Sequence, residues 1–165
     1  IRDAHALLEV GADGVVTGAL TAQGEPDTRL IEDMRNVCRE RELVFHMAFD
    51  LIKNSEHALE QMIGLRVNRI LTAGGQKTAL AGQEVISNLV NKSNGRIEVL
   101  PGGGVNADNV REILVRTGCS QVHGTFKVMQ NDPAGHVCGG EYPALDADQI
   151  RLVSEELNRY EVESQ

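Results

Sequence analysis

Histidines and charged side chains near the ends of two apolar segments are the residues best suited to acid–base chemistry. His46 and Asp50 end one such segment, and His123 and Lys127 end another. An imidazole close to a carboxylate can exchange protons with a substrate or bind a metal ion. We therefore take these four residues as catalytic candidates. The alternative for His46 is a buried histidine whose ring forms hydrogen bonds within the protein.

Two glycine-rich turns offer a second kind of chemistry, the binding of an anion. Gly74 and Gly75 follow one apolar segment, and Gly102, Gly103 and Gly104 follow the next. Glycine lets the backbone approach a ligand closely, and free N–H groups at the start of a helix favour a negative charge. The five glycines are thus candidates for an anion-binding rim, although a tight turn between strand and helix explains a glycine run equally well.

The cysteines are the remaining reactive side chains. Cys38 lies on the apolar stripe of an expected helix and Cys119 begins an apolar segment, so we expect both to be structural. His136 and Cys138 are weak candidates for a metal site, because two ligands lack a third. An odd number of cysteines without a CxxC motif indicates neither a disulfide framework nor a zinc finger, so we expect reduced thiols.

A repeating pattern of short apolar segments and helices positions these residues. The segments, rich in Val, Ile, Leu and Phe, are residues 14–20, 43–50, 69–72, 97–100 and 121–126. The helices that we expect before, between and after them are residues 3–10, 26–38, 54–64, 80–90, 106–118 and 148–160. Successive segments begin 24 to 29 residues apart, which matches a strand, a crossover helix and the next strand. The pattern therefore predicts a parallel sheet with right-handed connections.

The polarity of the strand faces favours a barrel over an open sheet. Alternation within residues 43–50 places His46 and Asp50 on one face and Phe45 and Phe49 on the other. A sheet covered by helices on both sides is apolar on both faces, whereas a barrel interior becomes polar at its mouth. The sequence predicts an α/β protein with a TIM-type barrel, present as an incomplete barrel of about five parallel strands.

Composition and charge disfavour several classes of partner. The net charge is −8, and the excess of acidic residues lies mostly in residues 131–165. Without a basic stripe and with few aromatic residues, nucleic-acid binding is disfavoured. No apolar run reaches the roughly 18 residues that cross a bilayer, and the N-terminus lacks the pattern of a secretory signal. We expect a cytoplasmic protein with no nucleic-acid or membrane partner.

The order of the motifs resembles that of a known family. The runs 11–20, 44–50, 69–75 and 101–105, together with His123, closely resemble the CutC copper homeostasis family over nearly the whole chain. The resemblance implies a TIM-type barrel of eight strands, of which this chain carries about strands four to eight. It also implies a role in copper homeostasis, with copper as a possible cofactor.

Departures from the family pattern limit what the resemblance implies for single residues. Met47 stands where the family usually has an arginine, so a positive charge at the mouth is absent. Gly124 and Thr125 stand where small residues, Cys or Ser are common. The cysteines discussed as copper ligands in the family lie on early strands, which this chain does not carry.

An incomplete barrel leaves two unpaired edges and an inner face with no opposite wall. We therefore expect residues 1–165 to form a single, partial CutC-like domain that either belongs to a longer product or assembles as a homo-oligomer.

Three functions are compatible with the sequence. The first is copper homeostasis through binding or handling of a copper ion. The second is a barrel enzyme for a small phosphorylated or carboxylated substrate, with the anion held by residues 102–104 and protons moved by the catalytic candidates. The third is a structural assembly module, and the fold alone does not choose among them.

Overall fold

Four parallel strands covered by helices form the body of the protein. The computed structural model describes residues 1–132 and 140–163. The strands β1 (Gly14–Thr17), β2 (Glu42–Phe45), β3 (Arg69–Thr72) and β4 (Glu98–Pro101) pair in the order β1-β2-β3-β4. The helices are α1 (Arg2–Glu9), α2 (Thr28–Cys38), α3 (Ser55–Gly64), α4 (Gln83–Ser93), α5 (Val110–Thr117) and α6 (Ala147–Glu163). The alternation of strands and helices confirms the predicted α/β fold.

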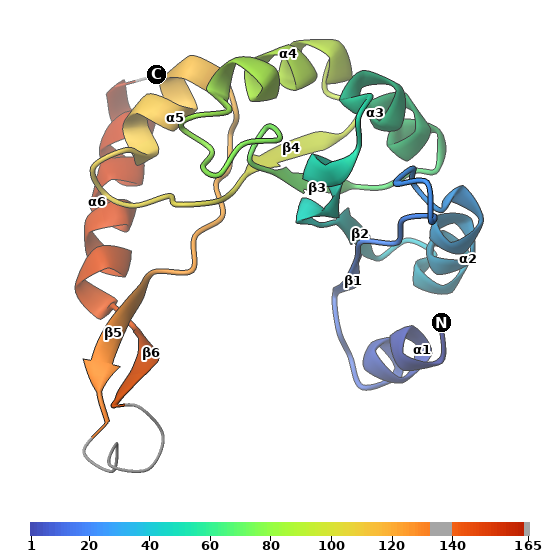
Figure 1. The fold of residues 1–165 in the computed structure, drawn as a ribbon, viewed down its shortest axis with the longest axis horizontal. Coiled ribbons are helices and arrows are strands. Elements are labelled where there is room, and N and C mark those ends of the chain that lie inside the picture. The colour runs from blue at the N-terminus through green and yellow to red at the C-terminus, as the bar shows by residue number, and fades with distance from the viewer. Residues whose placement is uncertain (133–139, 164–165) are drawn as a thin grey trace.

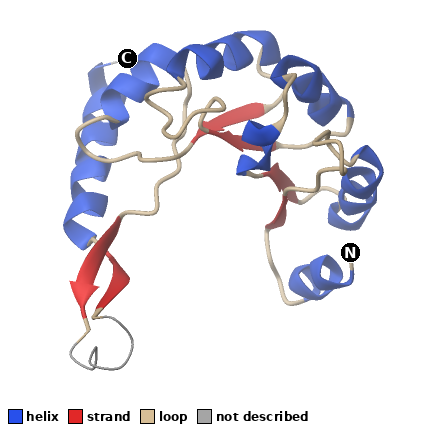
Figure 2. Cartoon of the chain, viewed as in Figure 1, coloured by secondary structure: helices blue, strands red, loops and turns tan. Residues whose placement is uncertain are grey.

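The sheet and its helices form an open arch. The helices α2 to α5 follow one another along the convex side of the sheet, and α1 lies at one end of the arch (Figure 1). The opposite end carries α6 and a two-stranded hairpin, and the long helices leave the concave side of the sheet uncovered (Figure 2). The arch therefore has the layering of one part of a barrel wall.

Alternation along the strands separates a buried outer face from an open inner face. Leu43, Phe45 and Ile70 are 0% exposed, so they belong to the core between sheet and helices. Val16 is 63% exposed, and it lies in register with Val44 on the inner face. This difference is expected when one face of a sheet is covered by helices and the other would line a barrel interior.

Polar side chains and a glycine explain three of the helix ends. The Asp27 carboxylate accepts a hydrogen bond from the Leu30 N–H at 3.0 Å, and the Asn54 side chain accepts one from the His57 N–H at 3.0 Å. Both residues are N-caps that satisfy a donor of the first turn. Gly118 ends α5 with φ +73°, a conformation that favours glycine.

One of the other helix ends agrees with the predicted range, and one differs from it. Gly64 is the last residue of α3, and the left-handed residue that follows is Arg66, with φ +55°. The Asn106 side chain accepts a hydrogen bond from the Asp108 N–H in a separate turn, so α5 begins only at Val110.

The predicted strand 43–50 was too long. The extended segment ends at Phe45, and a short 3-10 helix, η1 (Met47–Leu51), follows. The Phe49 N–H donates to the His46 carbonyl at 3.0 Å, which turns the chain and buries Ala48 and Phe49 together. The expected alternation of faces therefore breaks down after β2.

The predicted fifth parallel strand, residues 121–126, is reduced to a single bridge. The His123 N–H donates to the Pro101 carbonyl at 2.8 Å, and His123 bridges to Gly102. Phe126 then adopts φ +42°, and its ring lies against Gly124. The chain turns into an antiparallel hairpin of β5 (Lys127–Asn131) and β6 (Glu141–Leu145). The described residues therefore form four parallel strands and one parallel bridge rather than five parallel strands.

Within the described ranges, no helix combines the length and apolar character needed to span a bilayer.

Candidate functional site

The carboxyl ends of the parallel strands bring most of the candidate residues to one rim. Along this rim lie Gly18 after β1, His46 after β2, Gly74 and Gly75 after β3, and Gly102, Gly103, Gly104 and His123 after β4. The loop after β3 contacts the second glycine turn, because the Ala79 N–H donates to the Gly103 carbonyl at 2.9 Å. Active sites of TIM barrels lie at this end of the strands.

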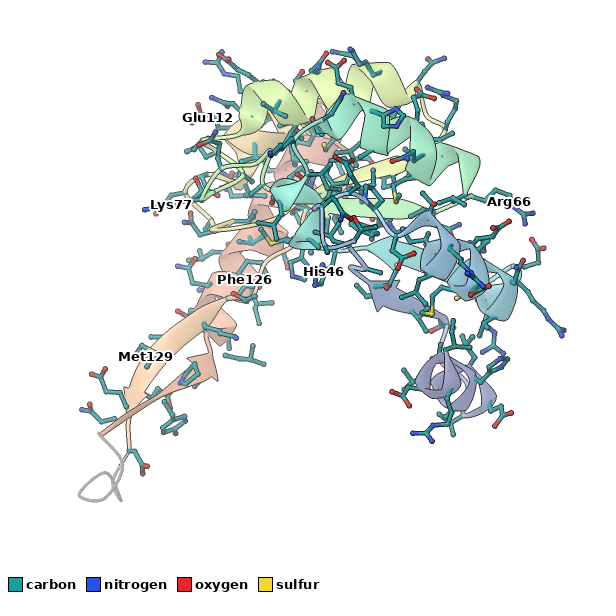
Figure 3. All side chains as sticks on the ribbon, turned by 45° about the vertical axis from the view of Figure 1, so that its right-hand side comes forward. His46, Arg66, Lys77, Glu112, Phe126 and Met129 are labelled. Carbon is teal, nitrogen blue, oxygen red and sulfur yellow. The ribbon has the colours of Figure 1, made fainter. Side chains whose placement is uncertain are left out.

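His46 is an exposed residue at the rim (Figure 3). Its Nδ1 accepts a hydrogen bond from the Ala48 N–H at 2.9 Å. A nitrogen that accepts carries no proton, so the neutral ring has its proton on Nε2. A metal-bound histidine ligates with a nitrogen that lacks a proton and donates from the other nitrogen. In this orientation, the Nε2 atom of His46 is suited to donating a hydrogen bond and not to binding a metal ion.

The position of the His46 ring depends on a small neighbour. A Cβ placed on Gly18 would lie 2.3 Å from Cε1 of His46. The absence of a side chain at residue 18 therefore lets the imidazole pack against the end of β1.

Asp50 binds backbone groups of the turn after β3. Its carboxylate accepts hydrogen bonds from the Thr72 hydroxyl, the Ala73 N–H at 2.8 Å and the Gly75 N–H at 2.9 Å. No hydrogen bond joins it to His46 among the described residues. The proposed His46–Asp50 proton-transfer pair is therefore not formed in this structure, and Asp50 holds the turn instead.

The turn at Gly74 and Gly75 already binds the carboxylate of Asp50. Gly74 and Gly75 have φ +69° and +71°, and the Gly74 N–H donates to the Thr72 hydroxyl at 2.9 Å. Together with the Asp50 contacts, this engages the backbone donors of the turn. External anion binding at Gly74 and Gly75 stays a prediction, and such an anion would compete with the Asp50 carboxylate.

The second glycine turn has donors that remain available. The Gly102 N–H donates to the Thr72 carbonyl at 2.9 Å, as part of the sheet. Across the described residues, no hydrogen bond involves the N–H groups of Gly103 and Gly104, which have φ +100° and +69°. Anion binding at this turn also stays a prediction, and it requires no displacement of an internal carboxylate.

The two candidates of the last segment are separated. His123 is exposed beside Gly102 at the rim. Lys127 belongs to β5, where every residue is exposed, and not to a strand of the barrel wall. The prediction that Lys127 lies at a strand end of the mouth was wrong because the chain turns at Phe126.

The described cysteines are buried thiols. Cys38 and Cys119 are 2% and 6% exposed, and neither forms a disulfide bond. Burial raises the pKa of the Cys119 thiol to about 11, and it also raises the pKa of Cys38, against the opposing charge of Arg35. Both thiols therefore stay protonated near neutral pH, which makes them poor ligands and poor nucleophiles.

Metal ligands are not grouped in the part of the chain that the structure describes. No set of three His, Cys, Asp or Glu side chains there could hold a metal ion. The weak candidates His136 and Cys138 lie outside the described residues.

A charged row on the inner face was missed by the sequence interpretation. Arg69 lies 3.8 Å from the Glu42 carboxylate and in register with Glu98, which accepts a hydrogen bond from the Ser120 hydroxyl at 2.9 Å. The Arg69 Nε and Glu42 Oε2 atoms are buried without a hydrogen-bond partner among the described residues. The alternation of side chains along each strand could have revealed this row, because it places these charged residues on the same face as Val44.

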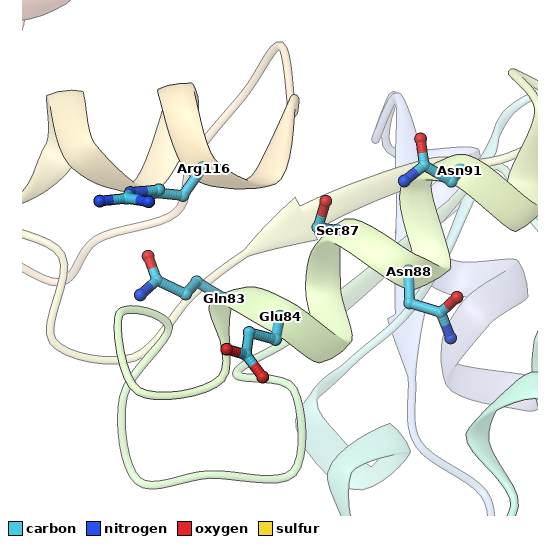
Figure 4. A pocket seen from close by; sticks show the side chains of 6 residues that line it. All are labelled: Gln83, Glu84, Ser87, Asn88, Asn91 and Arg116. Atoms are coloured by element: carbon cyan, nitrogen blue, oxygen red, sulfur yellow. The ribbon is translucent and has the colours of Figure 1, made fainter.

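Two hollows of the surface differ in their position relative to the rim. A polar groove of about 440 Å³ lies between α4 and α5 (Figure 4). Its lining residues are Gln83, Glu84, Ser87, Asn88, Asn91 and Arg116. A smaller hollow of about 280 Å³ adjoins Asp50, Gly74 and Gly75 on the side of Lys53 and Val85. The larger groove contains none of the predicted site residues.

Proteins of one family are similar to this chain in sequence. The profile of the CutC family matches residues 1–128. A CutC family protein of Xylella fastidiosa is 37% identical over 155 residues, covering 90% of this chain and 58% of that protein. The human copper homeostasis protein cutC homolog is 40% identical over 113 residues, covering 68% of this chain and 41% of that protein. The chain thus spans less than two thirds of the length of these relatives.

Solved structures agree with the barrel interpretation. A CutC protein from Streptococcus agalactiae superposes with a TM-score of 0.71 at 36% identity, covering 75% of this chain and 61% of that one. An aldolase, QR15, superposes with a TM-score of 0.61 at 14% identity, over 75% of this chain and 59% of that one, which shows the fold alone. The four-stranded wall is therefore part of a TIM-type fold, and the chain belongs to the CutC family.

Proposed function

We propose that this protein acts in copper homeostasis by binding or handling a copper ion in the cytoplasm. The observation that carries the proposal is the CutC family match over residues 1–128, supported by curated relatives at 32–43% identity. The free thiols of Cys38 and Cys119 agree with a reducing compartment.

The ligand preferences of Cu(I) limit which residues of this chain could bind it. Cu(I) favours thiolate, thioether and imidazole ligands. Cys38 and Cys119 are buried and protonated, so they are disfavoured as ligands. Cys138 is the remaining cysteine of the chain, so we take Cys138 and the neighbouring His136 as the proposed ligands, with further ligands from residues that complete the barrel.

The test is an anaerobic Cu(I) titration of the full-length gene product in competition with a coloured chelator. We expect Cys138→Ser to weaken Cu(I) binding by more than about tenfold. The matched change Cys119→Ser removes a buried thiol and should leave the affinity unaltered. An absence of Cu(I) uptake, or a loss caused by Cys119→Ser but not by Cys138→Ser, would refute direct binding at this site.

A further inference from the structure

Met47 brings a thioether to the rim. It is the first residue of η1, close to the end of β2, and it is partly buried. A Cβ placed on Gly103 would lie 3.6 Å from the Cε of Met47 and 3.3 Å from the Cβ of Ala73. The end of the Met47 side chain therefore lies beside the second glycine turn.

The other methionines lie elsewhere in the fold. Met34 and Met62 are 9% and 0% exposed and belong to the core. Met129 is 56% exposed, but it lies on the hairpin of β5 and β6, away from the wall that carries His46 (Figure 3). Met47 is therefore the thioether that this chain places at the rim.

His123 brings an imidazole to the same turn. A Cβ placed on Gly102 would lie 3.6 Å from the Cβ of His123, and the two residues form a parallel bridge. Within residues 1–132 and 140–163, no hydrogen bond involves the His123 ring. An imidazole nitrogen and a thioether sulfur thus lie beside two adjacent glycines, and the imidazole is free to bind an ion.

The two glycines leave the space beside these side chains open. A Cβ placed on Gly102 would lie 2.5 Å from the Cδ1 of Leu71. Gly103 has φ +100°, a conformation that favours glycine. Neither position therefore carries a side chain that would separate Met47 from His123.

We propose that the Sδ atom of Met47 and a ring nitrogen of His123 bind a Cu(I) ion at the rim. This inference rests on the proposed function, which makes Cu(I) the ion that this protein meets. Cu(I) favours soft thioether and imidazole ligands, and it is stable with few of them. A group of three His, Cys, Asp or Glu side chains, which the described residues lack, is therefore not required.

The chemistry of the rim favours a soft ion over a hard one. Mg²⁺ and Ca²⁺ prefer oxygen ligands, and the Asp50 carboxylate at the rim already accepts hydrogen bonds from the Ala73 and Gly75 N–H groups. Met47 and His123 are neutral donors of sulfur and nitrogen. The pair is therefore suited to a soft, singly charged cation.

The rim pair is a separate site from Cys138 and His136. A thiolate carries a negative charge that a thioether lacks, so the rim pair should bind Cu(I) less tightly than a site that contains Cys138. A weaker site at the open end of the strands exchanges its ion readily with the solvent. The rim pair is thus a place where Cu(I) enters or leaves the protein.

The experiment follows the methyl NMR signals of the methionines during an anaerobic Cu(I) titration of the full-length gene product. The protein carries Cys138→Ser, so that this thiol does not compete for the ion. We expect the Met47 signal to shift and to saturate, while the signal of the exposed Met129 stays in place. Unchanged signals of Met34 and Met62 show that the core is intact.

Matched variants in the same background test the two ligands by competition with a coloured chelator. Met47→Leu and His123→Gln should each weaken Cu(I) binding at the rim by about tenfold or more. Met129→Leu and His57→Gln make the same changes at exposed residues away from the rim and should stay within about threefold of the parent.

The outcomes separate this inference from the proposed function. A Met47 signal that does not move, or that moves together with the Met129 signal, would overturn the rim site. A His123→Gln variant whose Met47 signal responds as in the parent would overturn it too. These results leave binding at Cys138 to its own titration. A rim site that fills as expected, in a protein whose total Cu(I) uptake is unaltered by Cys138→Ser, would support the rim site and refute the Cys138 site.

Discussion

Asp50 supplies the negative charge that the glycine turn after β3 binds. Asp50→Asn replaces one acceptor oxygen by an NH₂ group that faces backbone donors, so we expect unfolding free energy to fall by about 1–3 kcal/mol. Urea unfolding measures this loss. Asp33→Asn makes the same chemical change at an exposed residue and should cost less than about 0.5 kcal/mol. Equal losses in the two variants would show that the Asp50 contacts contribute nothing.

Because the thiol of Cys119 is buried, we expect the stability of the fold to decrease at alkaline pH. Its pKa rises from 9.0 to about 11 on folding, because burial disfavours the thiolate. A raised folded pKa means that this stabilisation is complete below pH 9 and is lost as pH rises from 9 towards 11. The urea midpoint should therefore decrease more between about pH 8 and pH 10.5 in the wild type than in Cys119→Ala. Identical decreases would exclude a buried, protonated Cys119.

Arg35 connects three elements at the end of the sheet opposite the rim. Its guanidinium donates to the Arg66 carbonyl at 2.9 Å, to the Asn68 side chain at 2.8 Å and to the Arg41 carbonyl, and the residue is 6% exposed. This joins α2 to the segments that lead into β2 and β3.

Replacing Arg35 tests this connection. Lysine cannot reach the three acceptors with one ammonium group, so Arg35→Lys should cost about 1–3 kcal/mol of unfolding free energy. Arg39→Lys is the matched change at an exposed residue and should be near neutral. The comparison uses chemical unfolding of both variants, and a neutral Arg35→Lys would show that the three contacts are dispensable.

The elements that could be predicted are those with a long, regular apolar pattern. The helix caps at Asp27 and Asn54 and the parallel order of β1 to β4 follow from residue type and spacing. The failures lie where turn chemistry overrides alternation, at η1 after His46 and at the left-handed Phe126. Whether Asp50 faces His46 or the turn after β3 depends on contacts between elements, which no local pattern contains.

At the scale of the whole molecule, the inner face of the arch resembles the interior of a barrel in the residues that it carries. The inner face carries Val44 in register with Arg69, which in turn pairs with Glu98, and the rim beyond the strand ends carries His46 and the glycine turns. The barrel and its family could be recognised from the sequence. The hairpin could not, because the pairing of β5 with β6 joins segments that show no strong alternation of their own.

The central claim is that the face carrying Val16 lines a closed barrel in the functional protein. The direct test compares Val16→Cys with Val115→Cys in the full-length gene product, using the rate of modification by a maleimide. The two valines are 63% and 60% exposed in this chain, so an open wall would give similar rates. We predict that the cysteine at residue 115 reacts rapidly and that the cysteine at residue 16 reacts only after denaturation. Equally rapid modification of both cysteines in the native protein would contradict the account.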